Sequence, residues 1–244
     1  MKRIVLASLI VLSFVAASEA QAEKATRKRS DSLSASLLRQ APGLRAEVLR
    51  LALDAAKTAD ERGLVKRRDI LTVIDYSLPS TQPRLFVFDL AARKLLFREL
   101  VAHGKNSGDN RTNFFSNSPG SLATSLGLFV TEDTYVGGNG YSLRLRGLEE
   151  GVNDRARDRA IVMHGASYVS RAVIAALGRL GRSWGCPAVR KEVAKKMINT
   201  IRGGSAVFAY YPEKRWLASS KFFRKPAGSQ LTALGLQEDE STIR

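Results

Sequence analysis

Apolar residues recur at helical spacing near the start of the chain and at strand spacing further along. Leu44, Val48, Leu51, Ala52 and Ala55 are separated mostly by three or four positions, which predicts one amphipathic helix. From Ile70 onward the apolar runs become short and rich in β-branched and aromatic residues, as in ILTVIDYS, and such runs predict strands. The chain therefore begins with a helical region and continues as a sheet.

Two stretches have the pattern of paired strands joined by a short turn. RLFVFDLAARKLLFRELVAHG holds two apolar runs joined at residues 91–94, and LFVTEDTYV is joined to YSLRLRG by residues 137–140, GGNG, which tolerate positive φ. RAIVMHG predicts a buried strand that ends at His164 and Gly165, and SAVFAYYP predicts a last strand. The Asn-, Ser- and Gly-rich residues 105–127 predict a long surface loop. VSRAVIAALGRLG and VRKEVAKKMINTIRGG predict helices, the second with Val189, Val193, Met197, Ile198 and Ile201 on one face.

These elements divide the chain into four segments. We expect a signal peptide at 1–22, a basic helical lead-in at 23–69 with its apolar face on the main domain, one domain at 70–212, and a polar C-terminal tail at 213–244. Neither a repeat nor a low-complexity tract interrupts them. The pattern predicts a β-rich α+β domain with an N-terminal helical lead-in.

The first residues have the three parts of a secretory signal. MKR is basic, an apolar run extends from Ile4 to Ala17, and small residues at 18, 20 and 22 fit cleavage patterns. The run is shorter than the ~20 residues that cross a bilayer, although an uncleaved anchor is the alternative. Without a second apolar span, we expect a periplasmic, cell-envelope or secreted protein with no transmembrane segment after signal cleavage.

The charge balance points to anionic partners outside the cytoplasm. The formal net charge is +16, which favours anionic cell-wall polymers or lipid surfaces, and the alternative is a basic surface that only keeps the protein soluble. Dispersed basic residues, 7% aromatic residues and export argue against nucleic acid. We expect a monomer.

The chain uses cysteine once, in the stretch GRSWGCPAVRKEV. If a helix begins just after Cys186, Pro187 occupies its first position and the sulfur lies beside free backbone N–H groups, where the helix dipole stabilises a thiolate. Gly185 would then leave room for a substrate carbonyl. The alternative is a buried cysteine that behaves as a small hydrophobic residue.

A thiol nucleophile needs a base, and the chain has two histidines, His103 and His164. Each follows a predicted strand, and we favour His164 because a buried apolar run carries it to the rim of the sheet. One cysteine and two histidines have no zinc-ligand spacing, so we predict neither a metal nor a cofactor. Papain-type proteolysis is disfavoured because the histidine precedes the cysteine.

His164-Gly165 followed by Ser183-Trp184-Gly185-Cys186 resembles the active-site signature of YkuD-type L,D-transpeptidases. FSNSPGS, the run from SLGLFVTEDTYV to IVMHGA, and GRSWGCPAV are similar to the murein L,D-transpeptidase catalytic domain family over about residues 70–212. The resemblance implies a mixed-sheet domain with a cradle for peptidoglycan stem peptides. Cys186 would form a thioester with the donor stem and expel D-alanine, while His164 would act as base and then acid, oriented by a backbone carbonyl.

The sequence departs from the broader family pattern around the cysteine. Trp184 replaces a second histidine, and Pro187 and Ala188 replace the usual residues after the cysteine. Trp184 therefore forms either a water-excluding wall or a packing residue under the loop. We expect the oxyanion donors to be backbone N–H groups near Gly185 and Cys186.

Weaker candidates complete the predicted site. Ser183 would form a hydrogen bond to substrate or stabilise the turn. Arg182 and Arg190 would hold stem carboxylates or be solvated. Tyr141 lies in a stretch that resembles the family and is a candidate substrate contact. Three functions remain open at this point: transpeptidation to an amine that includes 3-3 cross-linking, a carboxypeptidase, exchange or hydrolase reaction on the same fold, and non-catalytic wall binding.

Overall fold

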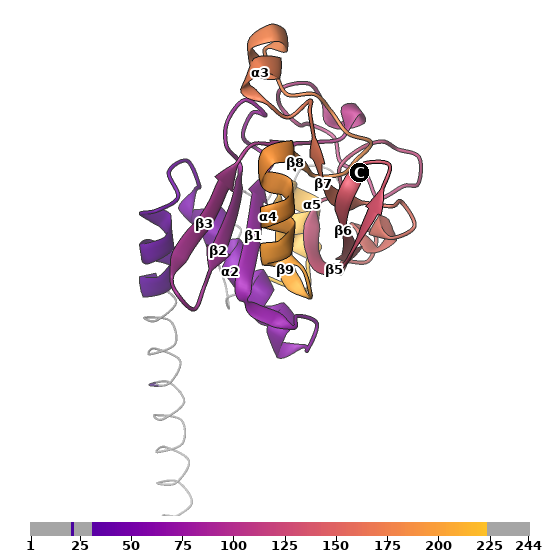
Figure 1. Ribbon diagram of the computed structural model, residues 1–244. Coiled ribbons are helices and arrows are strands. Elements are labelled where there is room, and N and C mark those ends of the chain that lie inside the picture. The colour runs from indigo at the N-terminus through magenta and orange to yellow at the C-terminus, as the bar shows by residue number, and fades with distance from the viewer. Residues whose placement is uncertain (1–20, 22–30, 224–244) are drawn as a thin grey trace, which may run out of the picture.

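The computed structural model describes residue 21 and residues 31–223, and its main feature is one nine-stranded sheet (Figure 1). Residues 31–38 are helical. The helices that follow are α2 (Ala46–Glu61), α3 (Arg171–Leu177), α4 (Lys191–Ile201) and α5 (Lys214–Ser219), with 3-10 turns η1 (Lys105–Ser107) and η2 (Asp154–Ala156). The strands are β1 (Arg67–Asp75), β2 (Leu85–Asp89), β3 (Lys94–Glu99), β4 (Val101–Ala102), β5 (Gly127–Gly137), β6 (Gly140–Gly147), β7 (Val162–Ala166), β8 (Ala188–Arg190) and β9 (Ser205–Tyr210).

The sheet is mixed, in the order β3-β2-β1-β9-β5-β6-β7-β8-β4. Two neighbouring pairs are parallel, β1 with β9 and β7 with β8, and the other pairs are antiparallel. The predicted β-rich, mixed-sheet α+β class is therefore confirmed. Both hairpins predicted from alternating residues form, as β2–β3 and β5–β6.

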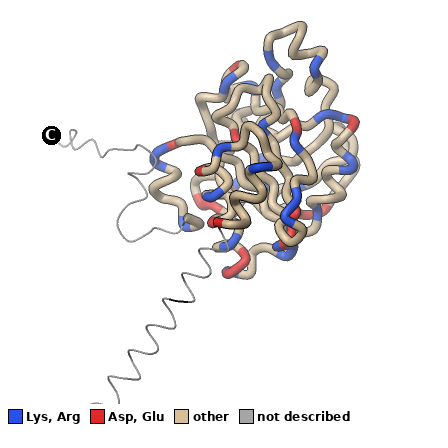
Figure 2. Tube along the Cα trace, turned by 90° about the vertical axis from the view of Figure 1, so that its left-hand side faces the viewer, with Lys and Arg blue, Asp and Glu red and all other residues tan. Residues whose placement is uncertain are grey.

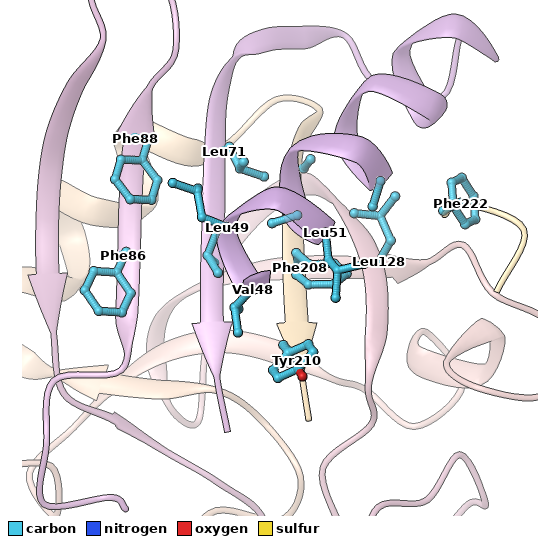
Figure 3. Packing of buried hydrophobic residues seen from close by; sticks show 14 of the residues in the cluster. Val48, Leu49, Leu51, Leu71, Phe86, Phe88, Leu128, Phe208, Tyr210 and Phe222 are labelled. Atoms are coloured by element: carbon cyan, nitrogen blue, oxygen red, sulfur yellow. The ribbon is translucent and has the colours of Figure 1, made fainter. Parts of the chain in front are cut away.

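Helices cover both faces of the sheet, with α4 in front of the sheet and α2 behind it in Figure 1. Strand β9 shows why both faces are apolar: Phe208 packs into the cluster under α2, whereas its neighbour Val207 packs into the cluster under α4. Because side chains alternate along a strand, consecutive apolar residues supply both cores. Figure 3 shows the first cluster, in which Leu49 and Leu51 of α2 lie over Leu71 and Phe208.

Two segment boundaries differ from the sequence prediction. Helix α2 and the start of β1 lie within the expected lead-in at 23–69, and α2 supplies a large part of the core. The expected polar tail begins with α5, where Trp216 and Phe222 are buried and the Trp216 ring lies 5.8 Å from that of Phe208. The physical reason is the apolar face of β9, where the Trp216 ring packs beside Phe208 and Tyr210.

The expected signal peptide lies almost wholly outside the described residues. Among the residues that are described, none of the helices combines the length and hydropathy needed to cross a membrane.

Candidate active site

Cys186 lies just before strand β8 and not at a helix N-terminus. The prediction of a helix cap is wrong, because residues 188–190 pair with β7 and β4, and α4 begins only at Lys191. Pairing on both sides holds the segment after Pro187 extended. The positive end of a helix dipole therefore does not act on the sulfur.

The thiol is nearly buried and is held by backbone groups of the segment before β7. The residue is 8% exposed, its Sγ accepts a hydrogen bond from the N–H of Val162 at 3.5 Å, and it lies 3.7 Å from the carbonyl oxygen of Ala160. Burial raises the pKa of the Cys186 thiol, and the Val162 N–H and the Arg159 charge act against that rise. The resting group is a neutral thiol.

His164 lies on β7, the strand next to the cysteine. It pairs in parallel register with Ala188, which follows Cys186 by two residues, and Val162 precedes His164 by two. Residues two apart on a strand share a face and lie ~7 Å apart along it, and diagonal neighbours on adjacent strands are within reach of long side chains. The register thus places the two predicted residues near each other on adjacent segments, although among the described residues the hydrogen-bond contacts of the Cys186 sulfur are with Val162 and Ala160 and not with the His164 ring.

A backbone carbonyl orients the His164 ring, as the resemblance implied. Its Nδ1 lies 3.2 Å from the carbonyl oxygen of Gly165, which corresponds to a proton on Nδ1 and a lone pair on Nε2. Burial lowers the pKa of His164, and the bond to Gly165 opposes that change. A neutral imidazole with a free Nε2 lone pair is the form that acts as a general base.

Gly165 also lets α4 approach the sheet. A Cβ at this position would lie 2.8 Å from the Ala194 Cβ and 3.2 Å from the Lys191 Cα, both in α4. The glycine is needed for helix packing as well as for its carbonyl.

The turn before the cysteine is fixed by Ser183. Its Oγ donates to the carbonyl oxygen of Cys186 at 2.6 Å and accepts from the N–H of Gly185 at 3.1 Å. Gly185 has φ +120°, a conformation that favours glycine, and a Cβ there would lie 2.8 Å from the carbonyl oxygen of Ala123. Ser183 therefore has the turn-stabilising role, and the Gly185 N–H is already bonded in the resting structure.

Trp184 is 75% exposed, so it is not a packing residue under the loop. It stands between the buried Ser183 and the buried Gly185, two residues before Cys186, and its side chain is open to solvent. An exposed large apolar side chain is a surface that a binding partner can cover.

The two candidate arginines and Tyr141 are engaged elsewhere. Arg182 is 2.8 Å from Asp109, and Arg190 forms a two-pronged pair with Glu99 at 2.8 and 2.9 Å. The Tyr141 hydroxyl donates to Asn199 of α4 at 2.7 Å. Since the guanidinium groups already pair with protein carboxylates, this arrangement offers neither as a clamp for a stem carboxylate.

A buried polar network that the sequence did not reveal supports the cysteine loop. Arg84 is fully buried, donates twice to the carbonyl oxygen of Val101, and lies 2.7 Å from Nδ1 of His103. The Nε2 of His103 donates a hydrogen bond to the carbonyl oxygen of Gly108, and the backbone carbonyl of His103 accepts a hydrogen bond from the N–H of Ser183 at 2.9 Å. His103 thus connects Arg84, Gly108 and the cysteine loop through hydrogen bonds.

Burial and the neighbouring Arg84 charge lower the pKa of His103 to about 4. A neutral ring that accepts from Arg84 at Nδ1 and donates at Nε2 satisfies both partners. The network links β2, β4 and the cysteine loop through buried hydrogen bonds.

Arg159 is a second residue that the sequence analysis missed. Its guanidinium interacts electrostatically with Cys186, and its Nη2 would lie 3.3 Å from a Cβ built at Gly185. The signal available in the sequence was its position directly before the predicted strand, in RARDRAIV, but nothing in that spacing indicates a contact with residue 186. Within residues 31–223 there is no cluster of three or more His, Cys, Asp or Glu that could hold a metal.

Solved structures of L,D-transpeptidases resemble this chain weakly. One from Mycobacterium smegmatis is 13% identical with a TM-score of 0.36 and 59% of each chain covered, and one from Stackebrandtia nassauensis is 15% identical with a TM-score of 0.36 and 66% of each chain covered. The helical cell shape determining protein Pgp2 from Campylobacter jejuni is 14% identical with a TM-score of 0.39, and the match covers 59% of this chain and 48% of Pgp2. This chain thus spans less than two thirds of each, and similarity at this level carries no information on activity.

The sequence itself gives the decisive comparison. No curated protein matches the chain. The family described as the L,D-transpeptidase catalytic domain (YkuD_2) matches residues 40–210, which include α2, the whole sheet, and both Cys186 and His164. The match begins within the expected lead-in, in agreement with the packing of α2 in the core. The chain belongs to the L,D-transpeptidase catalytic domain family.

Proposed function

We propose that this protein is an exported cysteine L,D-transpeptidase that acts on peptidoglycan stem peptides through a thioester on Cys186. The observation that carries the proposal is the placement of the chain's sole cysteine beside β7, where His164 is oriented by the Gly165 carbonyl. Membership of the L,D-transpeptidase family supports the same chemistry.

The directions of the two pKa shifts suggest how the nucleophile is activated. Burial raises the pKa of the Cys186 thiol and lowers that of the His164 imidazole, so both groups are neutral at rest. In this proposal the proton moves from sulfur to Nε2 of His164 as the sulfur attacks.

The reaction would then consist of two successive acyl transfers, first to the sulfur and then to an amine. The sulfur bonds to the carbonyl carbon at the L-centre of the third-residue diamino acid, and the bond to the terminal D-alanine breaks. His164 gives its proton to the departing amine of D-alanine, which leaves a thioester. An incoming amine loses a proton to His164, attacks the thioester and releases the thiol; a stem side-chain amine as acceptor gives a 3-3 cross-link.

The groups around the sulfur have separate tasks in this proposal. Because the Gly185 N–H bonds to Ser183, the backbone N–H of Cys186 is the candidate donor to the oxyanion. The exposed Trp184, two residues before Cys186, would pack on the acyl-enzyme and exclude water, which favours an amine acceptor over hydrolysis.

Export and a basic surface fit a cell-wall substrate. The signal-like residues 1–22 would send the protein to the periplasm or cell envelope, where it would act as a monomer without a metal or cofactor. Lys and Arg are spread along the whole described trace in Figure 2, which suits general attraction to anionic wall polymers more than one binding patch.

The test is to incubate purified protein with tetrapeptide stems and to measure free D-alanine, intact mass and muropeptide products. We expect D-alanine release, an acyl adduct on Cys186 and 3-3 dimers, all absent from Cys186→Ala. Release of D-alanine without dimers would instead identify a carboxypeptidase or exchange enzyme. Equal activity of Cys186→Ala would refute the proposal and leave a basic wall-binding protein.

A matched pair of histidine variants separates the base from the support network. His164→Gln should lose the adduct while the protein remains folded. His103→Gln should retain thioester formation in its folded fraction, because His103 does not contact the sulfur and acts only through the cysteine loop.

A further inference from the structure

The segment that leads into β7 wraps around the sulfur of Cys186. The Ala160 carbonyl and the Val162 N–H both approach Sγ, and Ala160 has φ +51°, which is uncommon for a residue other than glycine. The residue before it, Arg159, interacts electrostatically with Cys186, and its Nη2 would lie 3.3 Å from a Cβ built at Gly185. A strained residue in contact with a proposed nucleophile points to a functional constraint.

The Arg159 guanidinium is fixed in a cradle of neutral oxygens. Its Nη1 donates to the carbonyl oxygen of Ser116 at 2.7 Å and to Oγ of Ser125, and its Nη2 donates to the carbonyl oxygen of Ala123 at 2.6 Å and to Oγ of Ser121 at 3.1 Å. All acceptors belong to the long loop before β5. Four of the five N–H groups are therefore occupied.

The cradle leaves the positive charge uncompensated. None of the ion pairs among residues 31–223 includes Arg159, whereas the nearby Arg157 pairs with Glu132 and Arg182 pairs with Asp109. A guanidinium that is partly buried and lacks a carboxylate partner retains its full attraction for an anion beside it. The group beside it that becomes an anion on losing its proton is the thiol of Cys186.

The other titratable groups near the sulfur do not supply that attraction. His164 is neutral at rest, and Tyr76 and Tyr168, which interact electrostatically with Cys186, carry no positive charge. The helix dipole is absent because α4 begins after β8. Arg159 is thus the cation that acts on the sulfur, and it lowers the pKa of Cys186 against the effect of burial.

We infer that Arg159 is a positioning residue whose fixed charge stabilises the thiolate of Cys186 as it forms, in the role that a helix N-terminus has at other cysteines. The inference rests on Cys186 being the nucleophile of the proposed function. Since four of its N–H groups hold the loop, Arg159 acts as a stationary charge and not as a clamp that swings onto a substrate carboxylate.

The test measures the thiol directly and needs no peptidoglycan. The rate of iodoacetamide alkylation of the full protein is followed against pH for the wild type, Arg159→Met, Arg159→Gln and Arg159→Lys, with folding checked by circular dichroism. We expect the two uncharged variants to raise the apparent thiol pKa by about one unit, which makes alkylation about tenfold slower below that pKa. Arg159→Lys should keep the wild-type profile, because the charge remains although the four-bond cradle is lost.

Arg157→Gln is the matched control, because it removes the same charge from an exposed arginine paired with Glu132. Its alkylation profile should match the wild type. Wild-type profiles in folded Arg159→Met or Arg159→Gln would overturn the inference. If neither uncharged variant folds, Arg159→Lys decides: an unchanged profile supports the charge role, and a raised thiol pKa shows that only the loop contacts matter.

The assay also separates this inference from the proposed function. A pKa shift in a protein that releases no D-alanine would support Arg159 and reject the transpeptidase. Release of D-alanine together with an unchanged thiol pKa in the uncharged Arg159 variants would support the transpeptidase and reject the role of Arg159.

Discussion

Two buried regions of this protein lie on the same sheet and differ in chemistry. Under α2 the contacts are made by aliphatic and aromatic side chains such as Val48, Phe86 and Phe208 (Figure 3). The Cys186 side chain belongs to the apolar cluster under α4, but the loop that carries it is held by the buried polar groups Arg84, His103 and Ser183. Burial in the first region provides stability through the hydrophobic effect, whereas burial in the second creates a network that must be fully hydrogen-bonded.

The difference extends to the backbone. Positive φ values at Leu122, Ala160 and Gly185 occur in the segments that meet around the thiol. Under α2, strand β1 pairs with β9 in regular register over residues 71–75. The comparison teaches that the protein places regular packing where it needs stability, and irregular backbone with buried polar groups where it holds a reactive sulfur.

Removal of the sulfur should separate activity from stability most sharply. We expect Cys186→Ala to reduce D-alanine release from tetrapeptide stems by more than about 1000-fold, because no other group can form the thioester. Its free energy of unfolding should stay within about 1 kcal/mol of wild type, since the substitution removes a single heavy atom, the sulfur. Stem turnover and urea denaturation measure the two quantities, and a large loss of stability would mean that the thiol is mainly a core residue.

The opposite change is expected in the apolar region. Phe208→Ala should lower the free energy of unfolding by about 3–5 kcal/mol through loss of burial and creation of a cavity. The turnover of the folded fraction should be unchanged. Phe114→Ala is the matched control, because Phe114 is 53% exposed and its loss should cost no more than about 0.5 kcal/mol. Similar costs at the two positions would contradict the division into two regions.

The polar region should make stability depend on pH. His103 has a pKa of about 4 in the folded protein and an ordinary value of 6.5, so the unfolded chain binds more protons between these values. Stability from this group is complete above about pH 6.5 and falls by about 3 kcal/mol as the pH drops to about 4. His164, whose pKa is also lowered, acts in the same direction.

Urea denaturation at a series of pH values between 4 and 7 measures this effect. His103→Gln should flatten the dependence, and the residual slope should come from His164 and the carboxyl groups. An unchanged slope in His103→Gln would show that the Arg84–His103 contact is not a source of acid sensitivity.

The smallest effect is expected at the exposed Trp184. Trp184→Ala should lower kcat/KM for stem peptides about tenfold, or about 1.4 kcal/mol of transition-state binding, with the free energy of unfolding unchanged within about 0.5 kcal/mol. Val136→Ala removes an equally exposed apolar side chain, 79% exposed, at the far end of β5 and should change neither quantity. If Trp184→Ala is fully active, the indole does not contact the substrate.

Local patterns predicted most of the elements because each is stabilised by contacts that the pattern itself describes. The amphipathic helix at 46–61 and the hairpins β2–β3 and β5–β6 follow from helical periodicity, strand alternation and turn residues. The short strand β8 was misassigned as the start of a helix, because its apolar residues also fit the helical face and only pairing with β7 and β4 selects the extended form.

The candidate site could be predicted only in part, for a similar reason. Cys186 and His164 could be selected because the chain contains so few thiol and imidazole groups. Arg84 and Arg159 were missed because arginine is common in this chain and their partners lie far away in sequence.

The sequence by itself determined the β-rich class, the helix over the core, the family, and the cysteine and histidine that are candidates for catalysis. Only the tertiary structure decided what surrounds the sulfur: a short strand in place of a helix N-terminus, a buried arginine–histidine pair beneath the loop, and a cation beside the thiol. The physical reason is that side-chain periodicity is a local property, whereas the electrostatic environment of a buried atom is the sum of groups that only folding brings together.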